Sequence, residues 1–229
     1  DNYFEAPGSA TGIHLQGSGP RDEDGWSPRR TDGSRVERNT IVATAPQPSC
    51  GFCGGIRPRD GRNLVVSQNT VEGPWLNSIS TAMLYDSEIS GNRLEGAQWN
   101  GIALSRNPTS EYSTVNNVFR GNSVSGANFP GVRVLRACEN VFIGNNLRGN
   151  NLDGIEVPGF DDIGMWLGLS SGANIVLGNK NVVVDDGDYD CDWDGNSDPN
   201  LIAGGGRILR GIGLADKTSE GASSYGVLQ

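Results

Sequence analysis

The sequence predicts an all-β fold, a right-handed parallel β-helix with coils of about 22–30 residues and three short strands in each coil. Three observations support this prediction: a recurring Asn phrase, a recurring Gly phrase between its copies, and apolar residues that alternate with a period of two. No segment of the chain sustains the 3.6-residue period of a long amphipathic helix.

The Asn phrase consists of a small or charged residue, Asn, any residue and an aliphatic residue. Its copies are centred on Asn39, Asn69, Asn92, Asn122 and Asn145, which lie roughly 23 to 30 positions apart. Asn tolerates the left-handed backbone of a tight turn, and stacked Asn amides hydrogen-bond from one coil to the next. We therefore expect a column of Asn turns along one corner of the solenoid.

The Gly phrase consists of Gly, an aliphatic residue, any residue and a second aliphatic residue, and it supplies another strand of each coil. Its copies begin at Gly12, Gly101, Gly131 and Gly154, and residues 82–85 form a looser copy. Apolar segments just before the Asn turns, such as 64–66, supply a third strand. Residues 17–34, 43–53 and 158–172 interrupt the pattern and are predicted to be loops.

Composition narrows the class of protein. The 34 Gly residues follow no triplet period, which indicates many tight turns and not collagen. A net charge of -9 argues against a nucleic-acid partner, and no apolar stretch is long enough to span a bilayer. We expect the β-helix to occupy residues 1–184, and an acidic loop and C-terminal tail at 185–229 to pack on it or cap it. Because the chain opens inside a coil, we expect upstream sequence or another chain to cover that end.

The sequence contains four cysteines, which are Cys50, Cys53, Cys138 and Cys191. An even number in a loop-rich acidic chain is typical of an oxidising compartment, so we expect a secreted or cell-surface protein with structural disulfides. Free thiols and zinc binding remain alternatives. A zinc site would need a second close pair beside Cys50 and Cys53.

These repeats resemble the pectate-lyase-like right-handed β-helix superfamily, which includes pectate lyases, polygalacturonases and alginate epimerases. The resemblance covers roughly residues 1–184, and it implies a fold more than an activity. Residues 151–154 are similar to the Asn-any-Asp-Gly motif of polygalacturonases, and Asp161-Asp162 is similar to their paired Asp. In that family these carboxylates activate water and protonate the leaving oxygen, so Asp153, Asp161 and Asp162 are catalytic candidates. The Gly-His-Gly motif of the family is absent, and the alternative for Asp153 is a turn residue.

The residue between the two aliphatic positions of the Gly phrase points outward, and coils about 4.8 Å apart align these residues in a column. The predicted column contains His14, Arg57, Leu84, Ala103, Arg133 and Glu156, and a second column two residues on includes Arg59 and Asp86. Arg pairs well with the carboxylate of an acidic sugar. Candidate substrate-binding residues are therefore Arg57, Arg59, Asp86, Arg133 and Glu156, of which Arg133 and Glu156 are also catalytic candidates. The alternative is an ordinary solvated strand face.

Two further features suggest binding sites. Trp26 and Trp166 lie in predicted loops and are candidates for stacking on sugars. The acidic segment with Asp188, Asp190, Asp192 and Asp194 is similar to a calcium-binding loop, because alternating carboxylates can supply the oxygen ligands that Ca²⁺ requires. The alternative is a solvated acidic turn, since Leu201 stands where an EF-hand has its last Glu.

Two functions follow from these observations. The first is an extracellular protein that interacts with a polysaccharide, either as a lyase or hydrolase or as a binding module. The second is a non-catalytic structural or adhesive β-helix that forms part of a longer chain or fibre. The residues leave open whether the protein is an enzyme.

Overall fold

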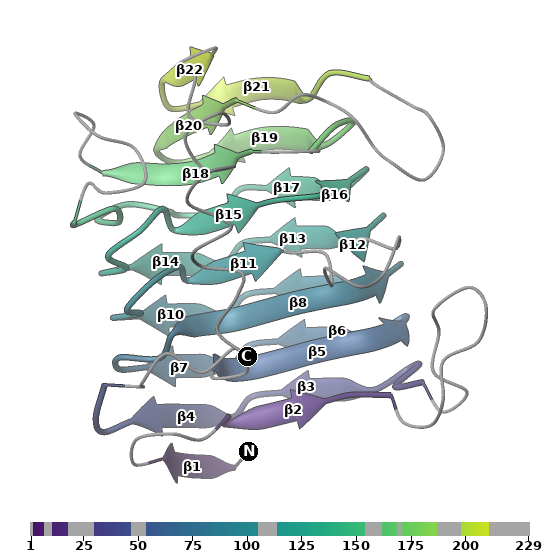
Figure 1. The fold of residues 1–229 in the computed structure, drawn as a ribbon, viewed down its shortest axis with the longest axis vertical. Coiled ribbons are helices and arrows are strands. Elements are labelled where there is room, and N and C mark those ends of the chain that lie inside the picture. Colours follow the sequence, from purple (N-terminus) through teal and green to yellow (C-terminus); the bar gives the residue numbers. More distant parts are fainter. Residues whose placement is uncertain are drawn as a thin grey trace.

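The computed structural model is a stack of short strands that wind around one long axis (Figure 1). It describes residues 2–6, 11–17, 30–46, 54–104, 114–153, 162–168, 171–186 and 198–210. The strands pair in parallel with their counterparts one coil away, which confirms the predicted all-β solenoid. In this part of the chain we find no helix with the length and hydrophobicity needed to cross a membrane.

The strands form three sheets, which we number 1 to 3. Sheet 1 contains β1 (Tyr3–Ala6), β4 (Thr40–Ala43), β7 (Thr70–Glu72), β10 (Arg93–Glu95) and β14 (Ser123–Ser125). Sheet 2 contains β2 (Ile13–Leu15), β5 (Gly54–Arg62), β8 (Asn77–Tyr85), β11 (Ile102–Leu104), β12 (Thr114–Val115), β15 (Val132–Val134), β16 (Ala137–Cys138), β18 (Ile163–Leu167), β20 (Val182–Asp185) and β22 (Ile208–Arg210). Sheet 3 contains β3 (Arg35–Glu37), β6 (Val65–Ser67), β9 (Glu88–Ser90), β13 (Val118–Arg120), β17 (Val141–Ile143), β19 (Ile175–Asn179) and β21 (Leu201–Gly205).

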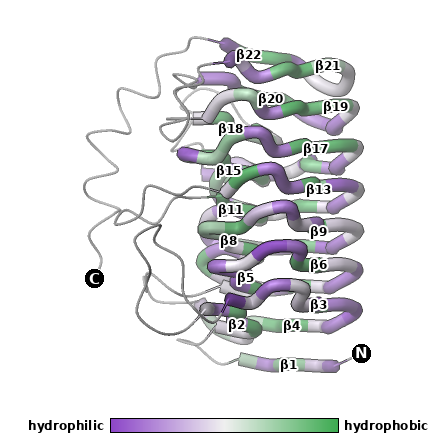
Figure 2. Tube along the Cα trace, turned by 90° about the vertical axis from the view of Figure 1, so that its right-hand side faces the viewer, coloured by the Kyte–Doolittle hydropathy of each residue, from purple (hydrophilic) through white to green (hydrophobic). Residues whose placement is uncertain are grey.

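The interior of the coils is filled by the apolar residue at the centre of each short strand. Ile41, Val71 and Leu94 lie in successive strands of sheet 1 and are completely buried. Phe119 and Phe142 lie in neighbouring strands of sheet 3 and stack with their ring centroids 4.8 Å apart. Hydrophobic and hydrophilic residues therefore alternate along the strands (Figure 2).

The predicted Asn column exists and forms a continuous buried ladder. It contains Asn39, Asn69, Asn92, Asn122, Asn145 and Asn179, at intervals of 30, 23, 30, 23 and 34 residues. Each side-chain amide donates to the amide oxygen of the next Asn, over distances between 2.7 and 3.0 Å. The backbone N–H groups donate to the same oxygens, so the ladder holds successive coils in register.

The left-handed residue at this corner is not the Asn, as the sequence suggested, but the residue before it. Arg38, Gln68, Gly91, Gly121 and Gly144 have φ values between 50° and 61°. This arrangement frees the Asn side chain to point into the coil, where its two donors and its acceptor are all satisfied.

A second ladder lies at the corner between sheets 2 and 3, and the sequence did not predict it. Asn117, Asn140, Asn174 and Asn200 donate in turn to one another over 3.0 to 3.2 Å. Ser87 continues the column, because its backbone N–H donates to Asn117 Oδ1. Both ladders together fix the coils at two of their corners.

Two predicted boundaries are wrong. The β-helix does not end at residue 184, because β21 continues sheet 3 and β22 continues sheet 2. Residues 158–172 are not simply a loop, because they include β18, which pairs with β15 and β20 and is fully buried. The predicted tail at 211–229 lies outside the described residues.

Candidate functional site

The longest connections between described strands begin or end at strands of sheet 2. The connection from sheet 3 to sheet 1 is only two residues long in several coils, for example at 38–39, 91–92 and 121–122. The long connections, such as 16–34, 44–53, 105–113 and 186–200, all lead into or out of strands of sheet 2. On a rigid scaffold, long connections of varied sequence are where binding residues concentrate. A binding site is therefore expected on the outer face of sheet 2.

The outward row of this face differs in part from the predicted column. Strand pairing aligns His14, Arg57, Ser80, Ala103, Arg133, Trp166 and Val184. Ser80 occupies the place predicted for Leu84, and Trp166 occupies the place predicted for Glu156. In the second row, Arg59 aligns with Ala82 and not with Asp86.

The register differs because β5 and β8 are nine residues long and bend near their C-terminal ends. Asp60 and Met83 adopt left-handed φ values of 59° and 55° at this bend. Leu84 lies after the bend and is completely buried in the core. Asp86 lies at the next corner, where its Oδ1 accepts a hydrogen bond from Asn116 Nδ2. Leu84 and Asp86 therefore do not belong to the outward face.

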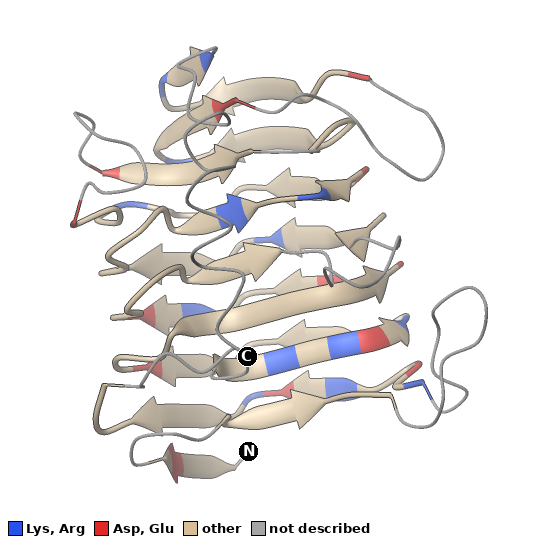
Figure 3. Cartoon of the chain, viewed as in Figure 1, with Lys and Arg blue, Asp and Glu red and all other residues tan. Residues whose placement is uncertain are grey.

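A basic cluster lies at one end of the face, formed by His14 on β2 and by Arg57 and Arg59 on β5 (Figure 3 shows the two Arg residues on β5). Arg57 is only 6% exposed. Burial is the larger cause, and repulsion from Arg59 the smaller one, that lowers the pKa of Arg57 to about 10. This residue therefore stays charged at neutral pH. Loss of solvent, followed by repulsion from Arg57 and Arg59, lowers the pKa of His14. The cluster is thus a site of concentrated positive charge in an acidic chain.

At the other end of the face, Arg133 and Trp166 form a cation–π pair. The guanidinium carbon of Arg133 lies 5.4 Å from the centroid of the Trp166 ring. Trp166 is completely buried and packs in a small apolar cluster with Ile163 and Val184 outside the coil interior. The prediction that Trp166 offers its ring to a sugar is therefore wrong, because the ring has no exposed surface.

The two ends are too far apart to hold one small ligand. Arg57 and Arg133 are separated by β8 and β11, so three strand steps give a distance of about 14 Å. The half-buried Ser80 and the small residue Ala103 lie between them. Small side chains between two cationic groups about 14 Å apart suit an extended ligand better than a compact one.

The structure describes two of the carboxylates that resemble the polygalacturonase motif, Asp162 and Asp153. Asp162 Oδ1 accepts hydrogen bonds from the backbone N–H of Gly149 and from Asn181 Nδ2, so this carboxylate ties two turns together. Asp153 is exposed in a turn that the left-handed residue Asn151 begins. The structure thus gives Asp162 a structural role, and it supports the turn interpretation of Asp153.

Several predicted site residues lie outside the described residues. They are Trp26, Glu156 and Asp161, the calcium candidates Asp188, Asp190, Asp192 and Asp194, and the cysteines Cys50, Cys53 and Cys191. Cys138 is buried and disulfide-bonded, but the pairing of the four cysteines stays a prediction. Among the residues that the structure describes, no group of three His, Cys, Asp or Glu side chains is placed to hold a metal ion.

Comparison with protein-family models shows which family the sequence belongs to. Residues 8–147 match the family model described as the right-handed β-helix region. The chain belongs to the right-handed β-helix family. This membership confirms the predicted handedness and the predicted resemblance.

Structures with a similar fold include two of the DFA-IIIase from Arthrobacter chlorophenolicus A6 in complex with GF2. The structure without the lid is 14% identical, with a TM-score of 0.44, and the match covers 93% of this chain and 48% of the enzyme. The other structure is 16% identical, with a TM-score of 0.42, and the match covers 91% and 50% of the two chains. This chain therefore spans about half the length of these enzymes. No curated protein matches the sequence.

Proposed function

We propose that this β-helix protein is a secreted or cell-surface protein that binds an acidic polysaccharide across the outer face of sheet 2. The observation that carries the proposal is the basic cluster of His14, Arg57 and Arg59 on adjacent strands of that face. Arg133 extends the positive charge along the same row, three strands away. The sugar carboxylates of a uronate polymer would pair with these guanidinium groups.

Partial burial makes the cluster a better anion site than exposed surface charges would be. Arg57 has little exposed surface, so a carboxylate would contact the half-buried Arg59 directly and would also be attracted by the charge of Arg57 beside it. Repulsion between Arg57 and Arg59 is relieved when an anion lies between them. Both effects favour a charged ligand over a neutral one on this face.

Binding, and not hydrolysis, is the activity that the described residues support. Cleavage of a glycosidic bond by hydrolysis requires two carboxyl groups on opposite sides of that bond. Asp162 is committed to backbone hydrogen bonds, and Asp86 lies away from the face. Hydrolysis would therefore depend on residues that lie outside the described part of the chain, such as Glu156 and Asp161.

The test is binding of polygalacturonate and alginate by affinity electrophoresis, with dextran as the uncharged comparison. The double variant Arg57→Gln/Arg59→Gln removes two charges from the face. The matched control Arg35→Gln/Arg93→Gln removes two charges from exposed ion pairs on sheets 3 and 1. We expect the first variant to weaken binding at least tenfold and the control to change it less than twofold. Equal loss in both variants, or no binding of either acidic polymer, would refute the proposal.

A second function, assembly end to end with another chain, is favoured by one observation at the first coil. Phe4 lies in register with the buried core residue Ile41, yet it is 39% exposed, because β1 has no described strand on its other side. An open parallel edge with an apolar residue is suited to pairing with another strand. Light scattering over a range of concentrations tests this function, and Phe4→Ser should then shift the protein towards monomers. A protein that stays monomeric at all concentrations would exclude self-assembly.

A further inference from the structure

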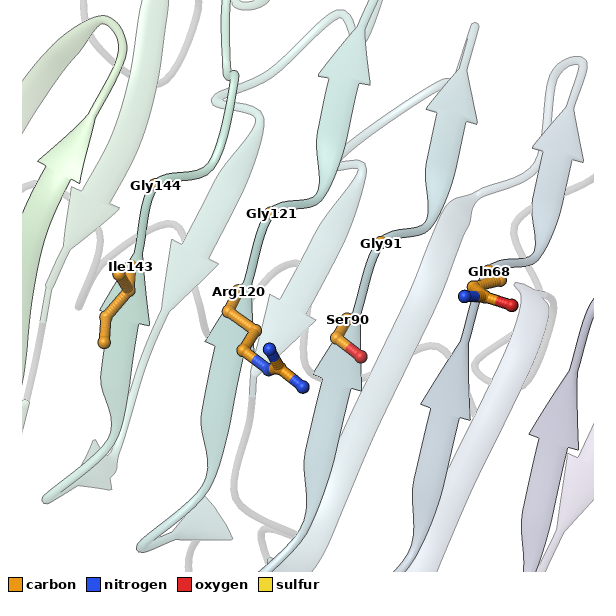
Figure 4. A pocket seen from close by; sticks show the side chains of 7 residues that line it. All are labelled: Gln68, Ser90, Gly91, Arg120, Gly121, Ile143 and Gly144. Atoms are coloured by element: carbon orange, nitrogen blue, oxygen red, sulfur yellow. The ribbon is translucent and has the colours of Figure 1, made fainter.

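A groove lies on the opposite side of the coil from the basic cluster, at the corner where sheet 3 turns into sheet 1 (Figure 4). Its volume is about 450 Å³, and it is open along its length. The residues that line it come from four successive coils and are Gln68, Ser90, Gly91, Arg120, Gly121, Ile143 and Gly144. Corresponding positions of neighbouring coils therefore follow one another along the groove at about 4.8 Å intervals.

Glycine keeps this groove open. Gly91, Gly121 and Gly144 occupy the left-handed position of the corner, but the same position holds Arg38 and Gln68 in other coils, with φ values of 54° and 56°. The backbone thus accepts a side chain there. A Cβ atom on Gly121 or Gly144 would meet no atom within 4 Å. Neither the turn nor the packing excludes a side chain at these positions, and a side chain would partly fill the groove.

The groove offers polar groups and apolar surface with a balanced charge. Arg120 donates from Nε and Nη2 to Glu88 Oε1, over 3.0 and 2.7 Å, so its charge is already paired. Ser90 donates to the same carboxylate oxygen over 2.6 Å. Gln68 is exposed and brings both an amide donor and an amide acceptor. Ile143 is 42% exposed and adds apolar surface beside the glycine backbone.

These features argue against two classes of polymer ligand, which are polyanions and peptides that add a strand to a sheet. A polyanion would gain little, because the one cation that lines the groove is paired with Glu88. A peptide could not add a strand here, because the N–H groups of Gly91, Gly121 and Gly144 already donate to Arg120, Ile143 and Leu177. A neutral sugar chain matches what remains, since its hydroxyl groups suit the amide, hydroxyl and guanidinium groups and its C–H faces suit Ile143 and glycine.

We propose that this corner groove binds a linear neutral glycan that lies along the axis of the β-helix. The site differs from the basic cluster in position and in ligand class, so either can exist without the other. Each coil that the glycan crosses presents a residue in the same orientation, and contacts that are weak singly add up along the chain. The expected complex is therefore weak for a disaccharide and stronger for longer chains.

The experiment is affinity electrophoresis of the whole protein in gels that contain soluble β-glucan, galactomannan, xylan or glucomannan. Gly121→Gln places a side chain like that of Gln68 two coils further along the groove. Gly33→Gln is the matched control, because Gly33 also has a positive φ, 70°, and nothing within 4 Å of a Cβ, but lies outside the groove. We expect retardation by at least one neutral polymer, a loss of at least fivefold in Gly121→Gln, and wild-type binding in Gly33→Gln.

A second variant keeps the proposal testable if Gly121→Gln does not fold. Arg120→Gln changes an exposed ion pair, so the fold should tolerate it, and it removes a donor from the groove. Arg120→Gln should weaken the binding of the neutral glycan. Arg57→Gln/Arg59→Gln should leave that binding unchanged. The proposal is wrong if none of the four polymers retards the protein, or if folded Gly121→Gln or Arg120→Gln binds like wild type.

Discussion

The replacement Asn145→Ala tests one internal rung of the first Asn ladder. Asn145 is 1% exposed and makes four side-chain hydrogen bonds. Its Oδ1 accepts from the backbone N–H and from Nδ2 of Asn122, over 2.9 and 3.0 Å. Its Nδ2 donates to Phe119 O over 3.0 Å and to Asn179 Oδ1 over 2.7 Å. The variant removes all four bonds and leaves their partners inside the coil.

The expected cost follows from the donors that lose their acceptor. The backbone N–H of Asn122 and one N–H of its side-chain amide both lose Asn145 Oδ1. A buried donor left without an acceptor costs about 1–3 kcal/mol, so the two donors give about 2–6 kcal/mol. That loss is a large share of the roughly 5–15 kcal/mol by which a domain is stable.

Urea unfolding followed by circular dichroism measures this loss as a shift of the midpoint. The neighbouring residue provides the control, because Asn146 is exposed on the outer surface of the same turn. Asn146→Ala should change the free energy of unfolding by less than about 0.5 kcal/mol. If Asn145→Ala costs no more than Asn146→Ala, the ladder does not stabilise the fold as argued here.

Three further predictions concern pH and metal binding. Because the pKa of His14 is lowered from 6.5, the residue gains its charge only below pH 6.5, so affinity for an acidic polysaccharide should rise as pH falls further below that value, and His14→Gln should remove this rise. The hydrogen bonds from Arg35 and then Ser67 lower the pKa of Glu37 to about 2, so the stabilisation by this carboxylate is complete above about pH 4.5 and is lost as pH falls through 2. If residues 188–194 bind calcium, saturating Ca²⁺ at about 100 times the dissociation constant should stabilise the protein by about 2.7 kcal/mol, and a chelator should reverse this.

Each of these predictions has an outcome that contradicts it. Polysaccharide affinity that falls between pH 7 and pH 5, or an unchanged pH profile in His14→Gln, would remove His14 from the binding face. For Glu37, the difference in melting temperature between wild type and Glu37→Gln should shrink from pH 6 to pH 2, and a constant difference would contradict the assigned pKa. For calcium, Asp190→Asn should abolish the stabilisation. If Ca²⁺ does not change the unfolding midpoint of the wild-type protein, the site is excluded.

The sequence was informative wherever one residue type has a single structural use. The Asn ladder was predictable because only an amide can donate to the coil above and accept from the coil below at one position. The second ladder was missed because its column begins with Ser34, Leu64 and Ser87, and Asn occupies it only from Asn117 onwards. A column of mixed residues gives no repeat signal in a single sequence.

The outward face was harder to predict because strand length varies from coil to coil. In β8 the phrase that pairs with Gly101-Ile102 begins with Ser78 and not with Gly, so the looser copy at 82–85 was aligned in its place. That shift moved a core residue, Leu84, to the predicted surface. Leu84 lies four residues after Ser80, an even step that would keep it on the same face, but the left-handed residue Met83 stands between them and the sequence does not show this interruption.

The corner groove shows how the same residue can serve the fold and leave room for a ligand. In the sequence, Gly91, Gly121 and Gly144 indicate only a turn, because glycine favours positive φ. The structure adds that Arg38 and Gln68 occupy that backbone conformation in other coils, so the turn alone does not require glycine. Since the Asn ladder beside them already fixes the register of the coils, the residue before each Asn is free to vary. A β-helix can therefore change its outer surface at this corner coil by coil, while the buried amides next to it keep the stack in place.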